Sequence, residues 1–417
     1  MNHAALRGWA PLVAAAAVYG GVLVTVAALR ADSSSDFRDF WENAVHFRQT
    51  GEIAADLGVH NYLPFFTLFM LPWGLLPLPV AAAVFTVFSL ALFALTVVIV
   101  EHLLHDGWSQ RPRGTLLLTL LLALPYVHSC AVVGSVSLLL LFLIMAAWLL
   151  VERGREWQAG AALGLAILIK LLPAALLVFF LLKRRWRVGG AAAAVVALLG
   201  LGLPLLALGP GETLAQHRAF LDRAVRGGSA VETLTATQPV KTHFSNNALP
   251  MVLRRLLSPT NAGRWSAREE FYVNFADLPA RARVWVYAGL AGLLLAASVV
   301  ITLWRGRRWP PADAAEGYVL RAQFGSWCCL MLLLSPLVWT HYLPLAYWPL
   351  AWLTDEAHRA TRRRLVVCVL ALALWGLAAV LLAWPPGRAA GAQLAGVIAL
   401  WLALACCNGV RMGTAKR

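Results

Sequence analysis

Three carboxylic acids fall within seven positions of this chain, at Asp36, Asp39 and Glu42, shortly after its first long apolar run. A carboxylate held beside a membrane is suited to take a proton from a hydroxyl group, because it is ionised near neutral pH. We therefore consider Asp36 the first candidate for a general base and Asp39 the second. The alternative is a solvated loop that is acidic without a catalytic role.

A short helix is predicted to carry these acids. Aromatic residues alternate with them, and Phe37, Phe40 and Trp41 recur at helical spacing. This pattern favours a helix that lies on the bilayer surface with its apolar side toward the lipid. Tyr62 opens the next apolar run and is a candidate for binding substrate, although Tyr62-x-Pro64 is also typical of the end of a loop.

A positive charge lies inside an apolar segment at Lys170, between Gly164 and Pro173. A charged side chain at mid-membrane costs about 2.5–3.5 kcal/mol on insertion scales, and it is a functional-site hypothesis by default. We interpret Lys170 as the cation for a donor phosphate, helped by Pro173, which breaks a helix and frees backbone groups. The alternative is that its long side chain reaches the membrane interface.

The second long polar stretch contains imidazole, hydroxyl and amide groups, which suit the hydroxyl groups of a sugar. These substrate-binding candidates are His243, Ser245, Asn246 and Asn247. Turn formation alone also accounts for Asn and Ser in such a run. Residues 249–257, which follow, form an amphipathic segment. Its adjacent Arg254 and Arg255 are predicted to approach a donor phosphate at the level of the lipid headgroups.

A last polar group interrupts an apolar run at Pro336. The proline breaks the helix and leaves carbonyl groups free, and Trp339, His341 and Tyr342 place hydrogen-bonding aromatic rings at the resulting end. We take His341 as a ligand of the donor phosphate, and Trp339 and Tyr342 as substrate-binding residues. The alternative is a structural hinge with an interfacial aromatic belt.

Composition decides the class of protein that positions these residues. Hydrophobic residues make up 60% of the chain, the mean hydropathy is +0.70, and apolar runs reach the ~20 residues that cross a bilayer. The sequence therefore predicts an all-α, polytopic membrane protein. Its net charge of +15 comes from short basic clusters at segment ends, so nucleic acid is not implied. The six cysteines lack a metal-ligand spacing, and we expect neither metal nor cofactor.

Nine apolar stretches are expected to form the membrane domain, at residues 9–29, 64–100, 114–151, 159–182, 188–209, 283–304, 320–353, 366–384 and 390–408. Three of them exceed one crossing and carry a break signal, at Pro77, at Pro125 to Ser129 and at Pro336. About 10–13 membrane helices in a single domain over residues 1–417 follow from this count. The first stretch lacks a small-residue cleavage pattern and is expected to be a retained helix.

Basic clusters predict the orientation of these helices in the cell membrane. Residues 183–187, 305–308, 359–364 and 411–417 belong on the cytoplasmic side. Both long polar loops, 30–62 and 210–282, then lie on the extracytoplasmic side and can share one site. Arginines near residues 111 and 153 face outward in this count, balanced by neighbouring acids. If those loops are inside instead, 159–182 becomes a re-entrant pair broken at Lys170 to Pro173.

The order of these motifs resembles glycosyltransferase family 87. The segments that carry the resemblance are Asp36-Phe-x-x-Phe-Trp-x-x-Ala44, Tyr62-x-Pro64, Gly134-Ser-Val-Ser137, Gly164-Leu-Ala-x-x-x-Lys170-x-x-Pro173, Phe244-Ser-Asn-Asn-Ala-Leu249 and Ser335-Pro-Leu-Val-Trp-Thr-His341. That family belongs to the GT-C superfamily of membrane enzymes that use polyprenyl-phosphate sugars, and it includes mannosyltransferases of bacterial envelope lipids. The resemblance implies a GT-C-like helical bundle with interfacial helices in its outer loops, a catalytic base at Asp36 and a donor-site role for His341.

Two departures leave the acceptor and the sugar open. The family commonly shows Gly-Gln-x-Asn where this chain has Gly134 to Ser137, and a second His where it has Tyr342. The predicted reaction is transfer of a hexose, mannose by the resemblance, from a polyprenyl-phosphate donor to a lipid or glycan hydroxyl, with inversion and without metal. The alternative is a transporter or lipid flippase, which the lack of internal repeats disfavours. Linkage and oligomeric state stay undetermined at this stage.

Overall fold

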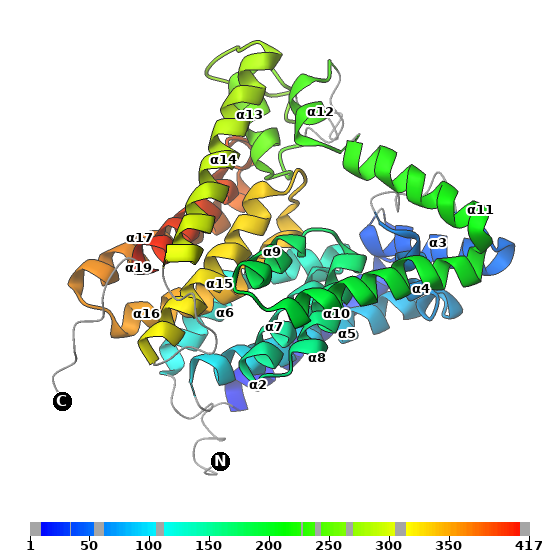
Figure 1. Cartoon of the computed structure of the whole chain (residues 1–417), viewed down its shortest axis with the longest axis horizontal. Coiled ribbons are helices and arrows are strands. Elements are labelled where there is room, and N and C mark those ends of the chain that lie inside the picture. The colour runs from blue at the N-terminus through cyan, green and yellow to red at the C-terminus, as the bar shows by residue number, and fades with distance from the viewer. Residues whose placement is uncertain are drawn as a thin grey trace. The chain divides into compact units, whose positions relative to one another are not determined.

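The computed structural model describes residues 10–33, 35–53, 62–105, 112–226, 228–237, 243–263, 270–304 and 314–408 of the chain. Helices dominate these residues (Figure 1). Within the described ranges the only pairing of extended backbone is one isolated antiparallel bridge between Asn246 and Trp339. The predicted all-α class is thereby confirmed. Two of the basic clusters used to predict the orientation, 305–308 and 411–417, lie outside the described residues.

Seven helical segments of the described chain are long and apolar enough to cross a membrane. They are α2 (Ala10–Leu29), α5 (Leu78–Leu104), α6 (Arg113–Val133), the run Trp186–Arg223, α14 (Ala280–Trp304), α15 (Ala314–Leu334) and α17 with the turn after it (Arg362–Ala383). Three shorter apolar helices, α7 (Ser137–Glu152), α8 (Glu156–Ile169) and α19 (Ala392–Asn408), bring the total to ten. A polytopic membrane bundle is confirmed.

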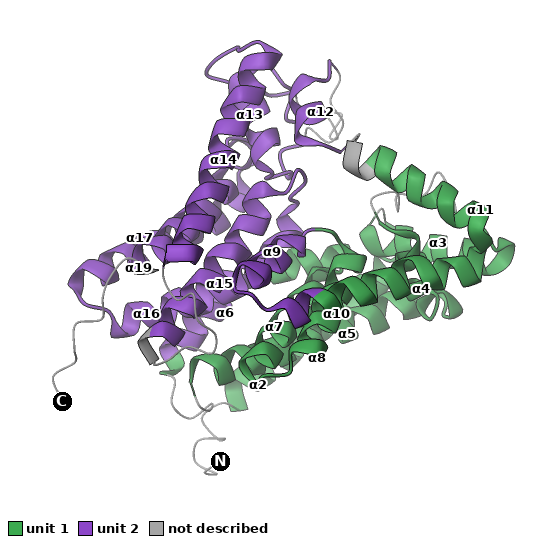
Figure 2. Ribbon diagram, viewed as in Figure 1, with its two compact units in different colours: residues 1–113, 126–171, 190–224 green, residues 114–125, 172–189, 225–417 purple. Residues whose placement is uncertain are grey.

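The chain divides into two compact units, each built from separate stretches of sequence (Figure 2). Unit 1 contains residues 1–113, 126–171 and 190–224. Unit 2 contains residues 114–125, 172–189 and 225–417. No change in composition marks these boundaries, because both units are made of the same apolar helices.

Unit 1 packs α5 against α2 and α7, and α7 against α8. Large side chains such as Phe66, Phe85 and Trp148 are almost fully buried there. Helix α3 (Asp36–Thr50) adds an amphipathic element, whose Phe37, Phe40 and Ala44 face the core. The helix predicted for the first polar loop is thus present, and Asp36 and Asp39 lie in its first turn. The prediction that its apolar side faces the lipid is wrong, because Phe37, Phe40 and Ala44 are buried against the protein.

Two of the three predicted breaks are found where the sequence placed them. Helix α4 (Pro64–Met70) is separated from α5 by the segment before Leu78. Helix α15 ends at Leu334, and a 3-10 turn, Thr340–Ala346, precedes α16 (Tyr347–Arg359). The third stretch, 114–151, is also broken into two helices, α6 and α7, but the break does not lie at the predicted Pro125 to Ser129. Helix α6 continues through Pro125 and ends at Gly134, whose φ of 69° makes it a left-handed cap. A proline inside a membrane helix is tolerated where neighbouring groups satisfy the freed backbone.

A further break separates α8 from α9 (Ala174–Leu182), at Lys170 to Pro173. The sequence predicted a helix break at Pro173, and it offered a re-entrant pair broken at Lys170 to Pro173 as the alternative topology. Lys170 itself has extended backbone, with φ −156° and ψ 134°. Extended backbone at the end of α8 directs this residue out of the helical ladder instead of leaving it in mid-helix.

The predicted outer loop 210–282 is largely helical at its start. The run beginning with α10 (Trp186–Ala197) continues through a π-helical stretch, Leu198–Gly202, into α11 (Leu203–Phe220). The predicted end of the span at residue 209 coincides with a kink at Gly209, where φ is 78°. The helix resumes after that kink because only the glycine leaves helical geometry.

Unit 2 packs α19 against α15 and α17, and α16 against α17. Its core includes Trp327, Trp348 and Trp375, each almost fully buried. Short helices complete this unit, namely α12 (Ala230–Thr235), α13 (Leu249–Leu257) and α18 (Pro385–Ala389). Helix α13 matches the amphipathic segment predicted for residues 249–257.

Candidate active site

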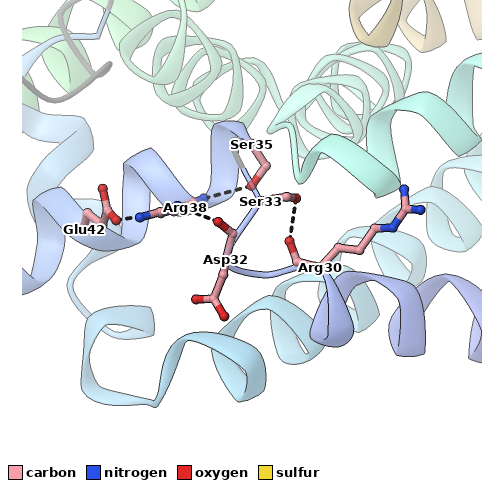
Figure 3. Close-up of polar contacts among 6 residues, drawn as sticks. All are labelled: Arg30, Asp32, Ser33, Ser35, Arg38 and Glu42. Atoms are coloured by element: carbon pink, nitrogen blue, oxygen red, sulfur yellow. Dashed lines mark hydrogen bonds and ion pairs between the residues drawn. The ribbon is translucent and has the colours of Figure 1, made fainter.

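The start of α3 is held by a polar network (Figure 3). Ser35 caps the helix, and its hydroxyl accepts a hydrogen bond from the Arg38 amide at 3.3 Å. The Arg38 side chain donates to the Glu42 carboxylate at 2.7 Å and to the carbonyl of Asp32. The Arg30 side chain points away from this network, while its carbonyl accepts from Ser33. These contacts fix the linker after α2, and they give Glu42 a structural partner.

Asp36 occupies the first position of α3 and is half-buried. Burial raises the pKa of its carboxyl to about 6, the charge of Lys170 opposes this rise, and Asp39 adds to it. The pKa of Asp39 is also raised, by burial and then by Glu42, while Arg38 opposes. Asp36 is therefore the carboxyl whose pKa lies closest to the range in which a general base operates.

Lys170 contacts Tyr62 in unit 1. Its ammonium nitrogen lies 3.4 Å from the Tyr62 hydroxyl, to which it donates, and 5.3 Å from the centre of the ring. The Tyr62 ring stacks on Phe66 at 4.3 Å and meets the edge of Phe40 at 5.2 Å. Since Phe40 belongs to α3, these rings connect the helix of Asp36 with the break that carries Lys170. The structure thus brings together three residues that the sequence singled out, Asp36, Tyr62 and Lys170.

A narrow, partly open hollow with a free volume of about 20 Å³ lies beside this group in unit 1. Tyr62 and Thr67 line one part of it, and Gln216 and Arg223 line another. This volume holds roughly one water molecule, so a sugar ring could enter only if the lining side chains moved apart.

A second cluster lies in unit 2, where two distant motifs pair. Asn246 and Trp339 form the antiparallel bridge, and the Asn247 amide donates to the Val338 carbonyl at 2.6 Å. The Asn246 side-chain oxygen accepts from the amides of Ala248 and Val338 at 3.2 and 3.3 Å. Two of the four polar residues predicted in the second outer loop therefore bind the backbone of the segment that precedes His341. This confirms neither residue as a sugar ligand, but it joins the two motifs.

The two histidines of this cluster differ in their surroundings. The Nδ1 atom of His243 accepts from the Ser245 amide at 3.2 Å. Burial, and then the charges of Arg388 and Arg255, lower the pKa of His243 to about 4, so its ring is neutral at pH 7. His341 is buried, and its ring meets the Tyr342 ring at 4.8 Å in a T-shaped contact.

Arg254 and Arg255 are buried, contrary to the expectation that they rest on lipid headgroups. Arg254 donates to the carbonyls of Thr233 and Ala236, both at 2.7 Å. Arg255 donates to three carbonyls, those of Ala389, His243 and Asn246, at 2.8 to 3.0 Å. Burial lowers the pKa of Arg254 to about 10 and that of Arg255 to about 9. Arg254 also donates to the Thr260 hydroxyl at 3.3 Å. Because both guanidinium groups already bind groups of the protein, we do not retain them as direct phosphate ligands.

Sequence reasoning missed Arg388, because it assigned no role to residues after 365. This side chain donates to the Ser245 hydroxyl at 2.6 Å and to the Thr340 hydroxyl at 3.1 Å. Its guanidinium carbon lies 4.6 Å from the centre of the Phe244 ring. The one available signal was an arginine directly after Pro385-Pro386-Gly387, between two otherwise apolar stretches.

Comparison with known proteins adds the following findings. The family model for glycosyltransferase family 87 matches residues 60–336. A protein of Mycolicibacterium smegmatis, named polyprenol-phosphate-mannose-dependent alpha-(1-2)-phosphatidylinositol mannoside mannosyltransferase, is 27% identical over 337 residues, which cover 76% of this chain and 67% of that protein. No solved structure matches the chain.

Proposed function

The chain belongs to glycosyltransferase family 87, and we propose that it moves a hexose, mannose in the first instance, from a polyprenyl-phosphate donor to a hydroxyl group of a lipid or glycan acceptor. Its family and its apolar helices make it a membrane glycosyltransferase. The donor is inferred from the name of the mycobacterial relative, which specifies polyprenol-phosphate-mannose. The predicted charge distribution favours transfer on the extracytoplasmic side of the cell membrane.

The observation that carries this proposal is the pairing of Asp36 with Lys170 in unit 1. The charge of Lys170 acts directly on the Asp36 carboxyl, whose pKa is about 6. A base with this pKa is mostly ionised at neutral pH, and it still accepts a proton readily in a transition state. The Asp36 carboxylate can accept one proton, and the Lys170 ammonium can stabilise one departing phosphate. Such a pair suits a reaction that removes a proton and releases a phosphate.

The bond changes follow from that pair. The acceptor oxygen attacks the anomeric carbon of the hexose, and its proton passes to a carboxylate oxygen of Asp36. The bond between the anomeric carbon and the phosphate oxygen breaks, and its electron pair leaves with polyprenyl phosphate. The configuration at the anomeric carbon inverts. Lys170 stabilises the negative charge that grows on the departing phosphate.

Other polar groups are proposed to hold the substrates. Tyr62 lines the hollow beside Lys170 and is assigned to a sugar ring. In unit 2, Ser245, Trp339 and Tyr342 are substrate-binding candidates, and His341 is a candidate for the donor phosphate. Asn246 and Asn247 are assigned mainly to holding the backbone of this region, because their side chains already bond to it.

Transfer is distinguished from transport by the fate of the sugar. Purified protein in lipid vesicles is incubated with radiolabelled polyprenyl-phosphate mannose and a total lipid extract. We expect label in a new lipid or glycan, separated by chromatography. Movement of unchanged donor across the vesicle membrane, with no new labelled product, would instead support a transporter.

Replacement of Asp36 by Asn tests the base. The expected loss in kcat is about 10²–10⁴-fold, because a positioned general base contributes that much. Asp32→Asn is the matched control in the same linker, since the Asp32 side chain is exposed and the network uses its backbone carbonyl. Full activity of the Asp36→Asn protein would remove the base assignment.

A further inference from the structure

Arg388 connects two motifs that are far apart in the sequence. It lies in the five-residue helix α18 and contacts Ser245, which is 143 positions away, and Thr340, which is 48 positions away. It also donates to the Leu382 carbonyl at 3.5 Å. The Phe244 ring supports the guanidinium plane from one side. All of these residues belong to unit 2.

The two hydroxyl groups that accept hydrogen bonds from Arg388 can still donate their own protons. The Thr340 oxygen accepts from Arg388 at 3.1 Å and from the Asn247 amide group at 3.5 Å. A hydroxyl has two acceptor sites and one proton, so the Thr340 proton stays available to a third group. The Ser245 oxygen accepts the shorter bond from Arg388, at 2.6 Å, and its proton is likewise available. The cluster therefore offers N–H and O–H groups in one place.

A second guanidinium reinforces the positive charge without competing for a ligand. Arg255 is fully buried and donates hydrogen bonds to carbonyls. One of these carbonyls belongs to Ala389, the residue next to Arg388. It holds α18 in position and adds charge. His243 is neutral and its Nδ1 atom is occupied by the Ser245 amide. Arg388 thus differs from Arg255 because its two shorter contacts are with hydroxyl groups, which can turn toward a ligand, whereas backbone carbonyls cannot.

We propose that Arg388, Ser245 and Thr340 form a binding site for the phosphate group of a lipid-linked substrate. A guanidinium presents paired N–H groups that match phosphate oxygens, and the two hydroxyls add charge-assisted hydrogen bonds. The inference rests on the proposed function for the existence of such a substrate. Both substrate classes can supply the phosphate, the donor as a polyprenyl phosphate and the acceptor as a phosphoglycolipid.

Ligand binding to the full-length protein in nanodiscs tests this site without sugar transfer. The probes are farnesyl phosphate for the donor class and phosphatidylinositol for the acceptor class, with farnesol and diacylglycerol as their neutral counterparts. For at least one phosphate probe we expect Arg388→Ala to weaken binding about 10- to 100-fold, as expected for lost hydrogen bonds to a charged group. Binding of the neutral counterpart should stay unchanged. The probe that responds identifies the source of the phosphate.

Further variants separate binding from folding. Arg388→Lys keeps the positive charge but loses the paired N–H groups of the guanidinium. Compared with Arg388→Ala, it should therefore recover part of the phosphate affinity and of the thermal unfolding temperature. Thr340→Val should weaken phosphate binding by a few-fold, because it removes one neutral donor. Arg363→Ala, at an exposed arginine of α17, is the matched control and should bind as the unaltered protein does.

Three results would overturn the proposal. They are unchanged affinity of Arg388→Ala for both phosphate probes, equal losses for phosphate and neutral probes, and a Lys variant that unfolds normally yet binds no better than the Ala variant. Failure of the unaltered protein to transfer mannose would refute the proposed function instead, and it would leave the phosphate measurements standing.

Discussion

The polar sites of unit 1 and unit 2 differ in the types of charged group that they contain. In unit 1 a carboxyl group faces an amine, and the charge of Lys170 acts against the burial that raises the pKa of Asp36. In unit 2 two guanidinium groups face hydroxyls, carbonyls and a neutral imidazole. The first arrangement can take up a proton near neutral pH. The second arrangement holds a constant positive charge. None of its groups with a shifted pKa titrates near neutral pH.

The comparison shows how the same kind of residue receives different roles. Arg255 is buried, and Lys170 and Arg388 are half-buried, but these three cations differ in their partners. Lys170 contacts a phenol, Arg255 contacts carbonyls and Arg388 contacts hydroxyls. A cation on carbonyls stabilises the fold, whereas a cation on hydroxyls or beside a carboxyl retains interactions that a substrate can replace.

Replacement of Lys170 should give the largest effect among tests of this contrast. Lys170 lowers the pKa of Asp36, so Lys170→Met should raise that pKa above its value of about 6. A base must be ionised, and therefore the acid limb of kcat/KM should move to higher pH. We also expect kcat to fall at least tenfold, since the cation beside the phosphate is lost. The pH profile of transfer measures both effects.

Two variants calibrate that result. Lys170→Arg keeps the charge and should leave the acid limb near its original pH. Arg388→Ala removes a cation from unit 2 and should not move this limb at all. If the acid limb shifted equally in the Arg388→Ala protein, the two sites would not be electrostatically distinct.

Gly134 provides an intermediate test, because it supports only the site in unit 1. Its φ of 69° is left-handed, and a Cβ atom at this position would overlap the Phe37 side chain, next to Asp36. Gly134→Ala should therefore displace the start of α3 and reduce kcat several-fold, in addition to a backbone strain of about 1–2 kcal/mol. Thermal unfolding and the transfer assay measure the two parts.

Gly51 is the matched control for that variant. It caps the other end of α3 with a φ of 76°, and no atom lies within 4 Å of a Cβ atom added there. Gly51→Ala should show the backbone strain without the loss of kcat. Equal losses of activity in both variants would mean that contact with Phe37 does not position Asp36.

His243 gives the smallest expected effect and concerns only unit 2. Its pKa is about 4 in the folded protein and 6.5 as an ordinary value. The folded state therefore binds fewer protons than the unfolded state between these values, and stability falls as the pH is lowered from 6.5 to about 4. His243→Asn keeps an acceptor for the Ser245 amide and should make this fall shallower. Unfolding temperatures across that pH window provide the measurement. An identical slope in both proteins would show that folding does not lower the pKa of His243.

Local patterns made much of the fold predictable. Helical spacing of aromatic residues indicated α3, amphipathic spacing indicated α13 over residues 249–257, and the proline at 336 marked the end of α15. Pro125 misled the prediction, because a proline inside a packed membrane helix does not have to end it. The helix instead ends at Gly134, where a left-handed residue is required.

The candidate site was predictable only in part. Asp36 and Lys170 stood out because charges are costly next to or inside apolar segments. Arg254 and Arg255 looked equally suited to a phosphate, yet both donate to carbonyls, and Arg254 also donates to the Thr260 hydroxyl. Nothing in the local sequence distinguishes an arginine that meets carbonyls from one that meets hydroxyls, since the partners come from other parts of the chain.

Composition and periodicity alone determined that this protein is an all-α membrane protein, where most of its helices run, and which isolated charges require an explanation. These are properties of neighbouring residues, and hydropathy and helical spacing report them directly. Only the tertiary structure decided the partners of each charge, the elevated pKa of Asp36 and the meeting of Arg388 with Ser245 and Thr340. Those properties depend on burial and on contacts across tens to hundreds of positions, which local spacing does not encode.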